Sequence, residues 1–130
     1  ASASYTTIIS GESTQSFKDA VGPLARECMA TVEATEDDYE TVLNRNPLDT
    51  RSSKCLLACV YEKLGGLKPD GQVVSGDELM PIMDRLYSFK EFKTVMRTQV
   101  VSNCVNEVNG LYDDKCELVQ HFLGCITRSY

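Results

Sequence analysis

The sequence contains no tryptophan, only one histidine and no long run of apolar residues. A helix that spans a bilayer needs about 18 consecutive apolar residues, so no membrane-spanning segment is predicted. Asp and Glu outnumber Lys and Arg by 19 to 13, which gives a net charge of −6. Nucleic-acid-binding proteins need a basic stripe that displaces counterions from phosphate. We therefore expect no nucleic-acid partner and no stable membrane insertion.

The scarcity of histidine also argues against an enzyme. His121 lies in no recognisable catalytic motif, whereas Ser-His-Asp and Cys-His chemistry needs an imidazole base beside the nucleophile. Asp70-Gly71 resembles the centre of a calcium loop, but it would place Gly66 and Lys68 at ligand positions, where neither side chain can bind calcium. We expect no enzymatic activity, no cofactor and no metal.

Cysteine, by contrast, is abundant, with six in 130 residues. An even number is typical of a disulfide framework in a secreted protein, and a chain of this length can also bury a sizeable core. The first residues are rich in serine and threonine and lack the apolar stretch of a signal peptide, so we expect a mature form from which the signal has been removed. A zinc site is disfavoured because only Cys55 and Cys59 are closely spaced.

Apolar residues recur every three or four positions from Gln15 onward, which predicts helices. The first helix carries Pro23, which removes a backbone hydrogen bond, so a kink or break is expected near Val21–Gly22. Capping and turn residues predict the others: one between Thr35 and Asn46-Pro47, one from Asp49 or Thr50 to Gly65-Gly66, one from Ser75 or Asp77, one from about Phe89 to Val108, and one from Asp113 or Asp114.

The predicted fold is all-α, with about six helices in a single domain over residues 1–130. No convincing alternating strand is present. Residues 1–12 are polar and are expected to form a loose N-terminal arm, and residues 126–130 form a short C-terminal tail.

The spacing of Cys55 and Cys59 limits their pairing. Four residues apart on a helix, they lie on one face and point the same way, so a bond between them would need distorted geometry. Each is expected to reach a different neighbouring helix, which makes their own helix a central post. Most of the 15 pairings that six cysteines allow stay open on this argument.

The full spacing, C-x26-C-x3-C-x44-C-x11-C-x8-C from Cys28 to Cys125, resembles the insect odorant-binding protein family. The resemblance implies an internal hydrophobic cavity and three interlocking disulfides: Cys28–Cys59, Cys55–Cys116 and Cys104–Cys125. It implies a soluble carrier of a small hydrophobic or amphipathic ligand such as an odorant or pheromone. It further implies secretion into an extracellular fluid such as sensillum lymph, a monomer or weak homodimer, and an odorant receptor as a further partner.

The alternative is a membrane-active or lipid-binding six-cysteine helical protein of the saposin type. Saposins, however, have paired C-x2-C gaps in a shorter chain, and this sequence has no such gaps and no basic amphipathic face.

Ten positions, counted from the cysteines, resemble pocket positions of the odorant-binding family, and apolar side chains there would supply affinity while tyrosine hydroxyls orient a ligand. These ligand-binding candidates are Val21, Leu57, Tyr61, Met80, Met83, Tyr87, Val101, Phe122, Ile126 and Tyr130. Each of them is equally suited to plain core packing. Residues 126–130 could cover the mouth of the cavity or fray, and His121 could assist pH-dependent release or be a solvated surface group.

Overall fold

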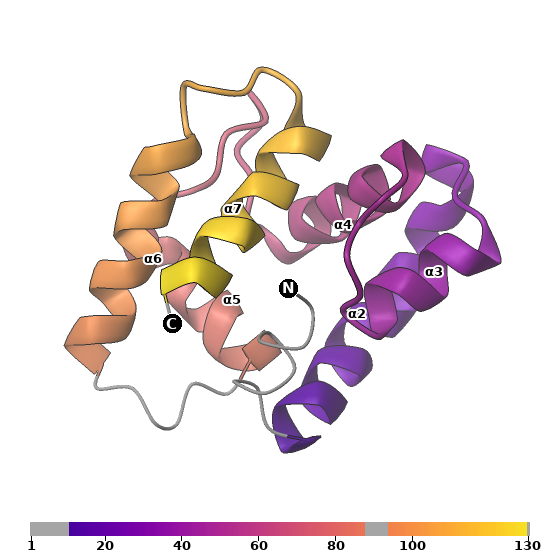
Figure 1. The fold of residues 1–130 in the computed structure, drawn as a ribbon, viewed down its shortest axis with the longest axis horizontal. Coiled ribbons are helices and arrows are strands. Elements are labelled where there is room, and N and C mark those ends of the chain that lie inside the picture. Colours follow the sequence, from indigo (N-terminus) through magenta and orange to yellow (C-terminus); the bar gives the residue numbers. More distant parts are fainter. Residues whose placement is uncertain (1–10, 88–93, 130) are drawn as a thin grey trace.

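The computed structural model describes residues 11–87 and 94–129, which contain six helices (Figure 1). They are α2 (Gly11–Val32), α3 (Glu36–Leu43), α4 (Arg51–Leu64), α5 (Gly76–Tyr87), α6 (Thr94–Val108) and α7 (Lys115–Ser129). The all-α prediction is confirmed. The expected start of one helix near Phe89 and most of the expected N-terminal arm lie outside the described residues.

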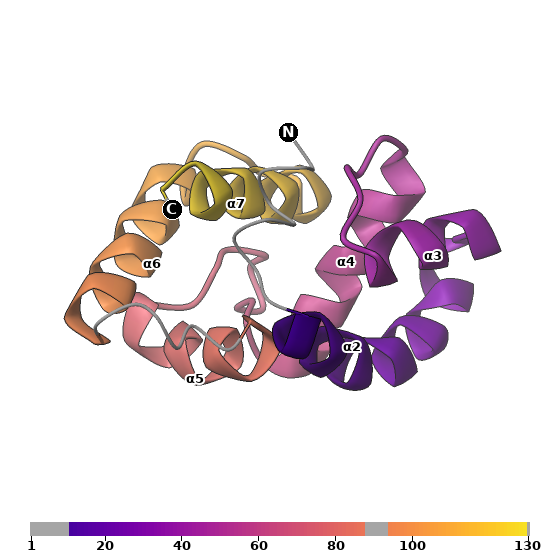
Figure 2. The same cartoon turned by 60° about the horizontal axis from the view of Figure 1, so that its bottom comes forward.

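Five helices close into a ring by packing on their neighbours. α4 packs on α7, α7 on α6, α6 on α5, α5 on α2, and α2 again on α4. α3 packs on the outside of this ring, against α2 and α4, as Figures 1 and 2 show from two directions. Buried apolar side chains from all five ring helices form one cluster, so the ring encloses the hydrophobic interior.

Three disulfides join the helices of the ring in the pairing that the family resemblance implied. Cys28–Cys59 links α2 to α4, Cys55–Cys116 links α4 to α7, and Cys104–Cys125 links α6 to α7. The helix that carries Cys55 and Cys59 is thus bonded to two different neighbours, which confirms the central post. Loops of these lengths are worth about 3–4 kcal/mol each in the chain-entropy model. All six sulfurs are bonded, which leaves no thiolate for the zinc alternative.

α2 continues through Pro23 without a break, although Figure 2 shows that it bends along its length. The helix also begins at Gly11, one turn before the expected start at Gln15. Pro23 and Asp19 are both exposed, so the Asp19 carbonyl that loses its helical partner can accept from water instead. The predicted interruption near Val21–Gly22 is therefore limited to a bend.

The first turns of α3 and α4 are joined through one buried carboxylate. Thr35, at the predicted start of α3, forms a capping box with Asp38: Thr35 Oγ1 accepts the N–H of Asp38 at 3.1 Å, and Asp38 Oδ2 accepts the N–H of Thr35 at 3.0 Å. Asp38 also accepts hydroxyl hydrogen bonds from Thr50, the N-cap of α4, and from Ser52. The 5% exposure of Asp38 makes this network part of the interior of the α3–α4 contact.

Burial by itself raises the pKa of Asp38, but the hydroxyls of Ser52 and Thr50 and the N–H of Thr35 outweigh burial and hold the pKa below its ordinary value. A carboxyl whose pKa is lowered on folding stabilises the fold above the unfolded pKa, about 3.9, and loses that contribution as the pH falls through the folded pKa. Acid should therefore loosen the α3–α4 contact.

We expect Asp38→Asn to lower the free energy of unfolding at pH 7 by about 1–3 kcal/mol, because it removes charge-assisted hydrogen bonds from a buried group. The difference in unfolding free energy between the variant and the wild type should narrow as the pH falls below about 4, because Asp38 of the wild type is then progressively protonated. Urea unfolding of the oxidised protein at several pH values measures both. Asp49→Asn, an exposed neighbour, is the control; a gap that stays constant down to pH 2 would contradict the assignment.

The start of α5 lies against α6 at a position that only glycine fills without a clash. A Cβ at Gly76 would lie 2.1 Å from Ser102 Oγ and 3.0 Å from Ser102 Cα. The two helices can approach this closely because Gly76 has no side chain. In contrast, a Cβ at Gly124 within α7 would have 3.6 Å to the nearest atom, the Nη1 of Arg128.

The same substitution should therefore have opposite effects at the two glycines. Gly76→Ala should destabilise the protein by about 1–3 kcal/mol because α5 and α6 must move apart. Gly124→Ala should stabilise it by up to about 1 kcal/mol, because alanine has the higher helix propensity. Thermal unfolding of both variants measures the difference, and an unchanged stability of Gly76→Ala would show that the contact is not tight.

Candidate functional site

The ring interior brings together eight of the ten sequence-predicted ligand positions. All eight are buried, with at most 9% exposure. They are Val21, Leu57, Tyr61, Met80, Met83, Val101, Phe122 and Ile126. The side chains of the other two, Tyr87 and Tyr130, lie outside the described residues. Burial is what both ligand contact and core packing require.

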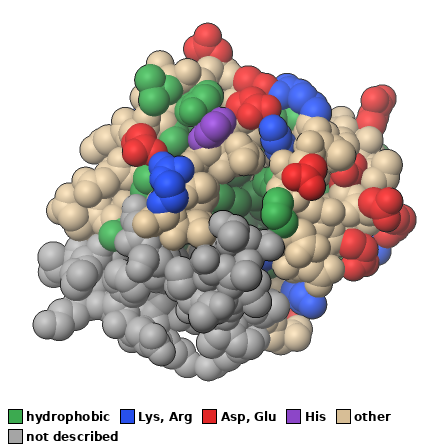
Figure 3. Space-filling model, in the orientation of Figure 1, with side chains coloured by type: hydrophobic (Ala, Val, Ile, Leu, Met, Phe, Trp, Pro, Cys, Tyr) green, Lys and Arg blue, Asp and Glu red, His purple; other side chains and the backbone are tan. Residues whose placement is uncertain are grey.

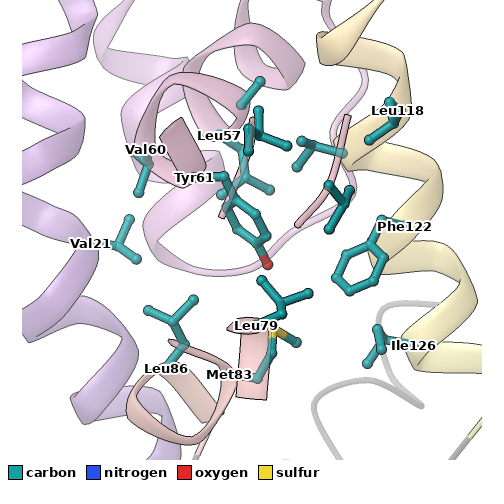
Figure 4. Packing of buried hydrophobic residues seen from close by; sticks show 14 of the residues in the cluster. Val21, Leu57, Val60, Tyr61, Leu79, Met83, Leu86, Leu118, Phe122 and Ile126 are labelled. Carbon is teal, nitrogen blue, oxygen red and sulfur yellow. The ribbon is translucent and has the colours of Figure 1, made fainter. Parts of the chain in front are cut away.

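Tyr61 supplies a polar group within this apolar interior. Its side chain extends from α4, and Figure 4 shows the hydroxyl directed toward Leu79 of α5, with Phe122 of α7 to one side. Tyr61 has no exposed surface. A Cβ on Gly66 would lie 3.5 Å from Tyr61 Cδ2 and 3.4 Å from Leu79 Cδ1, so the backbone at Gly66 packs directly against the ring of Tyr61. A tyrosine hydroxyl within an apolar pocket is a group that can orient a bound ligand.

α7 contributes one apolar face, made by Leu118, Phe122 and Ile126 at four-residue spacing (Figure 4). Ile126 is 4% exposed and belongs to α7, which continues as far as Ser129. The residues that follow Cys125 are therefore helical up to that point and extend the wall that Phe122 begins.

Leu79 and Leu86 of α5 also point into the interior, although the sequence argument did not single them out as ligand positions. Both have no exposed surface, and Figure 4 shows them on the same side of α5 as Met83. The sequence pattern could have identified both leucines, because residues 79, 83 and 86 follow the i, i+4, i+7 spacing of one helix face. The ten candidates are chosen by their distance from the cysteines in the family resemblance, and that choice does not include the two leucines.

A hydrophobic depression opens on one face of the molecule. Figure 3 shows apolar side chains at its floor, between α7 and α4, and the histidine close to its edge. Ion pairs link the two helices and their connections along this side: Arg51 with Asp114, Lys54 with Glu117 at 3.1 Å, and Lys115 with Glu62 at 2.9 Å.

The hydrogen bond from Arg51 holds the pKa of Asp114 below its ordinary value, against the effect of burial. Asp114 also caps α7 by accepting the N–H of Cys116 at 3.0 Å, as the sequence predicted for Asp113 or Asp114. Arg51–Asp114 and Lys115–Glu62 are solvent-accessible pairs, so each of the two adds little stability. Together with Lys54–Glu117, they mark a polar rim along the α4–α7 side of the apolar floor.

His121 lies on this rim with 43% of its side chain exposed. Its ring stacks on Tyr112, with 4.3 Å between the ring centroids, and its Nε2 is 3.8 Å from Glu117 Oε2. The imidazole therefore contacts surface groups from the α6–α7 turn and from α7 itself.

Two further properties bear on the function. Across residues 11–87 and 94–129, none of the helices combines the length and the apolar character needed to cross a bilayer. In the same parts of the chain, His, Cys, Asp and Glu side chains form no group of three or more arranged to hold a metal ion.

Comparison with known proteins assigns the fold to a family. The sequence profile of the PBP/GOBP family matches residues 10–129. General odorant-binding protein 19d of Drosophila melanogaster is 29% identical over 111 residues, which cover 84% of this chain and 71% of that protein. Odorant-binding protein dmelOBP28a of the same species, at 22% identity, shares the fold with a TM-score of 0.72 over 85% of this chain and 89% of that chain.

A pheromone-binding protein from the cockroach Leucophaea maderae is more similar. Its crystal structure is a complex with the fluorescent reporter ANS (1-anilinonaphthalene-8-sulfonic acid). That protein is 56% identical to this chain and superposes with a TM-score of 0.79, over 89% of this chain and 97% of that chain. The family match replaces the saposin-type alternative. The chain belongs to the PBP/GOBP family of insect odorant-binding proteins, whose members are ligand carriers and not enzymes.

Proposed function

We propose that this protein carries a small hydrophobic or amphipathic molecule in the interior of its helix ring. The observation that carries the proposal is the convergence of apolar side chains from α2, α4, α5 and α7 in one cluster that contains Tyr61. The cockroach relative, in complex with ANS, supports it, because ANS combines an apolar aromatic body with one polar end. Within the described part of the chain, the interior combines a large apolar surface with the hydroxyl of Tyr61.

The driving force for binding would be burial of the ligand's apolar surface. This is worth roughly 25 cal/mol per Å² before the costs of association are subtracted. Opening space in a packed interior costs stability, and the three disulfides offset that cost by holding the ring helices together. Met83, flexible and polarisable, is suited to adapt its shape to different ligands.

The proposed ligand-contacting set contains the ten sequence-predicted positions together with Leu79 and Leu86. Those in the described part of the chain come from five helices of one ring, so a ligand at its centre would touch side chains far apart in the sequence. Tyr61 is the polar member of the described set, and it would select ligands that have an oxygen or another hydrogen-bonding group.

ANS fluorescence offers a direct test, because the chain has no tryptophan whose emission could report binding. We expect the oxidised protein to bind ANS at one site, with displacement by apolar volatiles or fatty acids. Phe122→Leu should weaken binding about fivefold, since it removes about 1 kcal/mol of aromatic contact.

Leu111→Ala is the matched control, because Leu111 is 69% exposed and its truncation should leave ANS affinity unchanged. ANS also binds loosely packed states, so one-to-one stoichiometry and competitive displacement are required parts of the result. The absence of binding by any apolar compound to the fully oxidised protein would overturn the proposed function.

Ile126 tests whether the end of α7 forms part of the ligand wall. Ile126→Ala should weaken the binding of ANS or of a displacing ligand severalfold, because a buried branched side chain is removed from beside Phe122. Arg128→Ala, two residues later and exposed, is the control that removes the ion pair with Glu107 but no interior contact. Equal affinity of both variants and the wild type for every ligand tested would remove Ile126 from the site.

Secretion into an extracellular fluid such as sensillum lymph is part of the proposal. The family is one of typically secreted proteins, and three disulfides require an oxidising compartment. We also propose a monomer or weak homodimer that delivers its ligand to an odorant receptor. Light scattering across a concentration series checks the first point, and receptor currents recorded with and without the protein check the second.

A further inference from the structure

The connection between α4 and α5 contains a short hairpin over residues 66–74, which we call the 66–74 hairpin. It is held by the Leu67–Val73 bridge, by Lys68 N–H to Gln72 O at 2.7 Å, and by Val74 N–H to Gly66 O at 3.0 Å. In this antiparallel arrangement Leu67 and Val73 form a pair without mutual hydrogen bonds, so the N–H and C=O of Val73 point to the outer edge of the hairpin. Val73 is fully buried, so both groups need partners.

The side chain of Asn109 supplies both partners. Its Oδ1 accepts the N–H of Val73 at 2.9 Å, and its Nδ2 donates to the C=O of Val73 at 2.9 Å. A primary amide carries one acceptor and one donor group side by side, as a peptide group of a neighbouring strand would. Asn109 therefore takes the place of a third strand at this position. The sequence predicted only that a helix ends at Val108, immediately before Asn109.

A second side-chain amide, that of Gln72 in the hairpin, bonds to the backbone of the α6–α7 turn. Gln72 Oε1 accepts the N–H of Gly110 at 2.7 Å, and Gln72 Nε2 donates to the C=O of Tyr112 at 3.3 Å. The hairpin and the α6–α7 turn thus each place one side-chain amide on the other's backbone. We call Asn109 and Gln72 together the two-amide clamp.

The inner side of the hairpin belongs to the hydrophobic interior. Leu67, Val73 and Val74 are buried and are members of the interior cluster. The hairpin begins at Gly66, which packs on Tyr61 and Leu79, and near its tip a Cβ on Gly71 would lie 3.7 Å from Lys115 Cβ at the start of α7. The hairpin therefore spans from the interior near Tyr61 to the first turn of α7, and lifting it would expose interior side chains.

We propose that Asn109 and Gln72 are positioning residues that hold the 66–74 hairpin as a fixed wall of the ligand-binding interior and thereby slow the exit of ligand. This inference rests on the proposed function. Neither amide needs to touch the ligand. Their effect is to place Val73, Val74 and Leu67 against it and to keep the hairpin from opening.

Asn109→Asp provides a nearly isosteric test. The carboxylate keeps the acceptor for the N–H of Val73 but loses the donor, and it places an oxygen against the carbonyl of Val73. Hydrogen exchange of the Val74 and Lys68 amides, which bond within the hairpin, should accelerate about tenfold, while α4 amides keep their rates. Stopped-flow dilution of the ANS complex should show dissociation about tenfold faster, at a temperature where every variant is fully folded.

Asn106→Asp is the matched control: it makes the same charge change in α6 at an exposed position. It should leave both rates unchanged. Gln72→Glu removes the donor to Tyr112 O in the same way and repeats the test from the other side of the clamp, should Asn109→Asp fail to fold.

The two measurements separate the parts of the inference. Unchanged hairpin exchange in both clamp variants would show that the amides do not hold the hairpin. Faster hairpin exchange with unchanged ANS dissociation would show that the hairpin is not a wall of the site. If the wild type binds no ANS, the proposed function and the wall fail together, whereas hydrogen exchange still decides whether the clamp exists.

Discussion

The fold depends on α4 being covalently bonded to two neighbours at once. Cys59 attaches α4 to α2 and Cys55 attaches it to α7, so the two bonds leave the same face of one helix in different directions. The third disulfide joins α7 to α6. Because α5 packs between α6 and α2, these bonds and contacts close the ring. Leu57 and Tyr61 follow the cysteines by two residues each, so the bonds that set the rotation of α4 also direct these side chains to the interior.

The polar interactions around this disulfide-bonded ring differ in how much they contribute to stability. The exposed ion pairs along α4 and α7 lie in solvent, where each is worth little. The polar groups with larger consequences are buried or half-buried: Asp38, which joins the first turns of α3 and α4, and Asn109, which satisfies the backbone of Val73. Removing the hydrogen-bond partners of Asp38 or of Val73 would lower the free energy of unfolding more than the loss of one surface ion pair would.

The local features of the fold were predictable because they arise from neighbouring residues. Thr35 with Asp38, Thr50 before α4, and Gly65 at the left-handed end of α4, where φ is +85°, occupy the positions that capping chemistry assigns them. Pro23 shows the limit of such reasoning. Its effect depends on whether water can replace the lost hydrogen bond, and that depends on the exposure of one side of α2 in the assembled ring.

The residue pattern by itself determined the helices, their caps and the apolar faces, because helical periodicity and capping act within a few residues. It also excluded a disulfide between Cys55 and Cys59, although the complete disulfide pairing came from resemblance to a family. Only the tertiary structure decided which apolar side chains converge around Tyr61 and that Asn109 meets Val73, 36 positions away in the chain. Such contacts depend on how whole helices are rotated and stacked, which no local sequence period encodes.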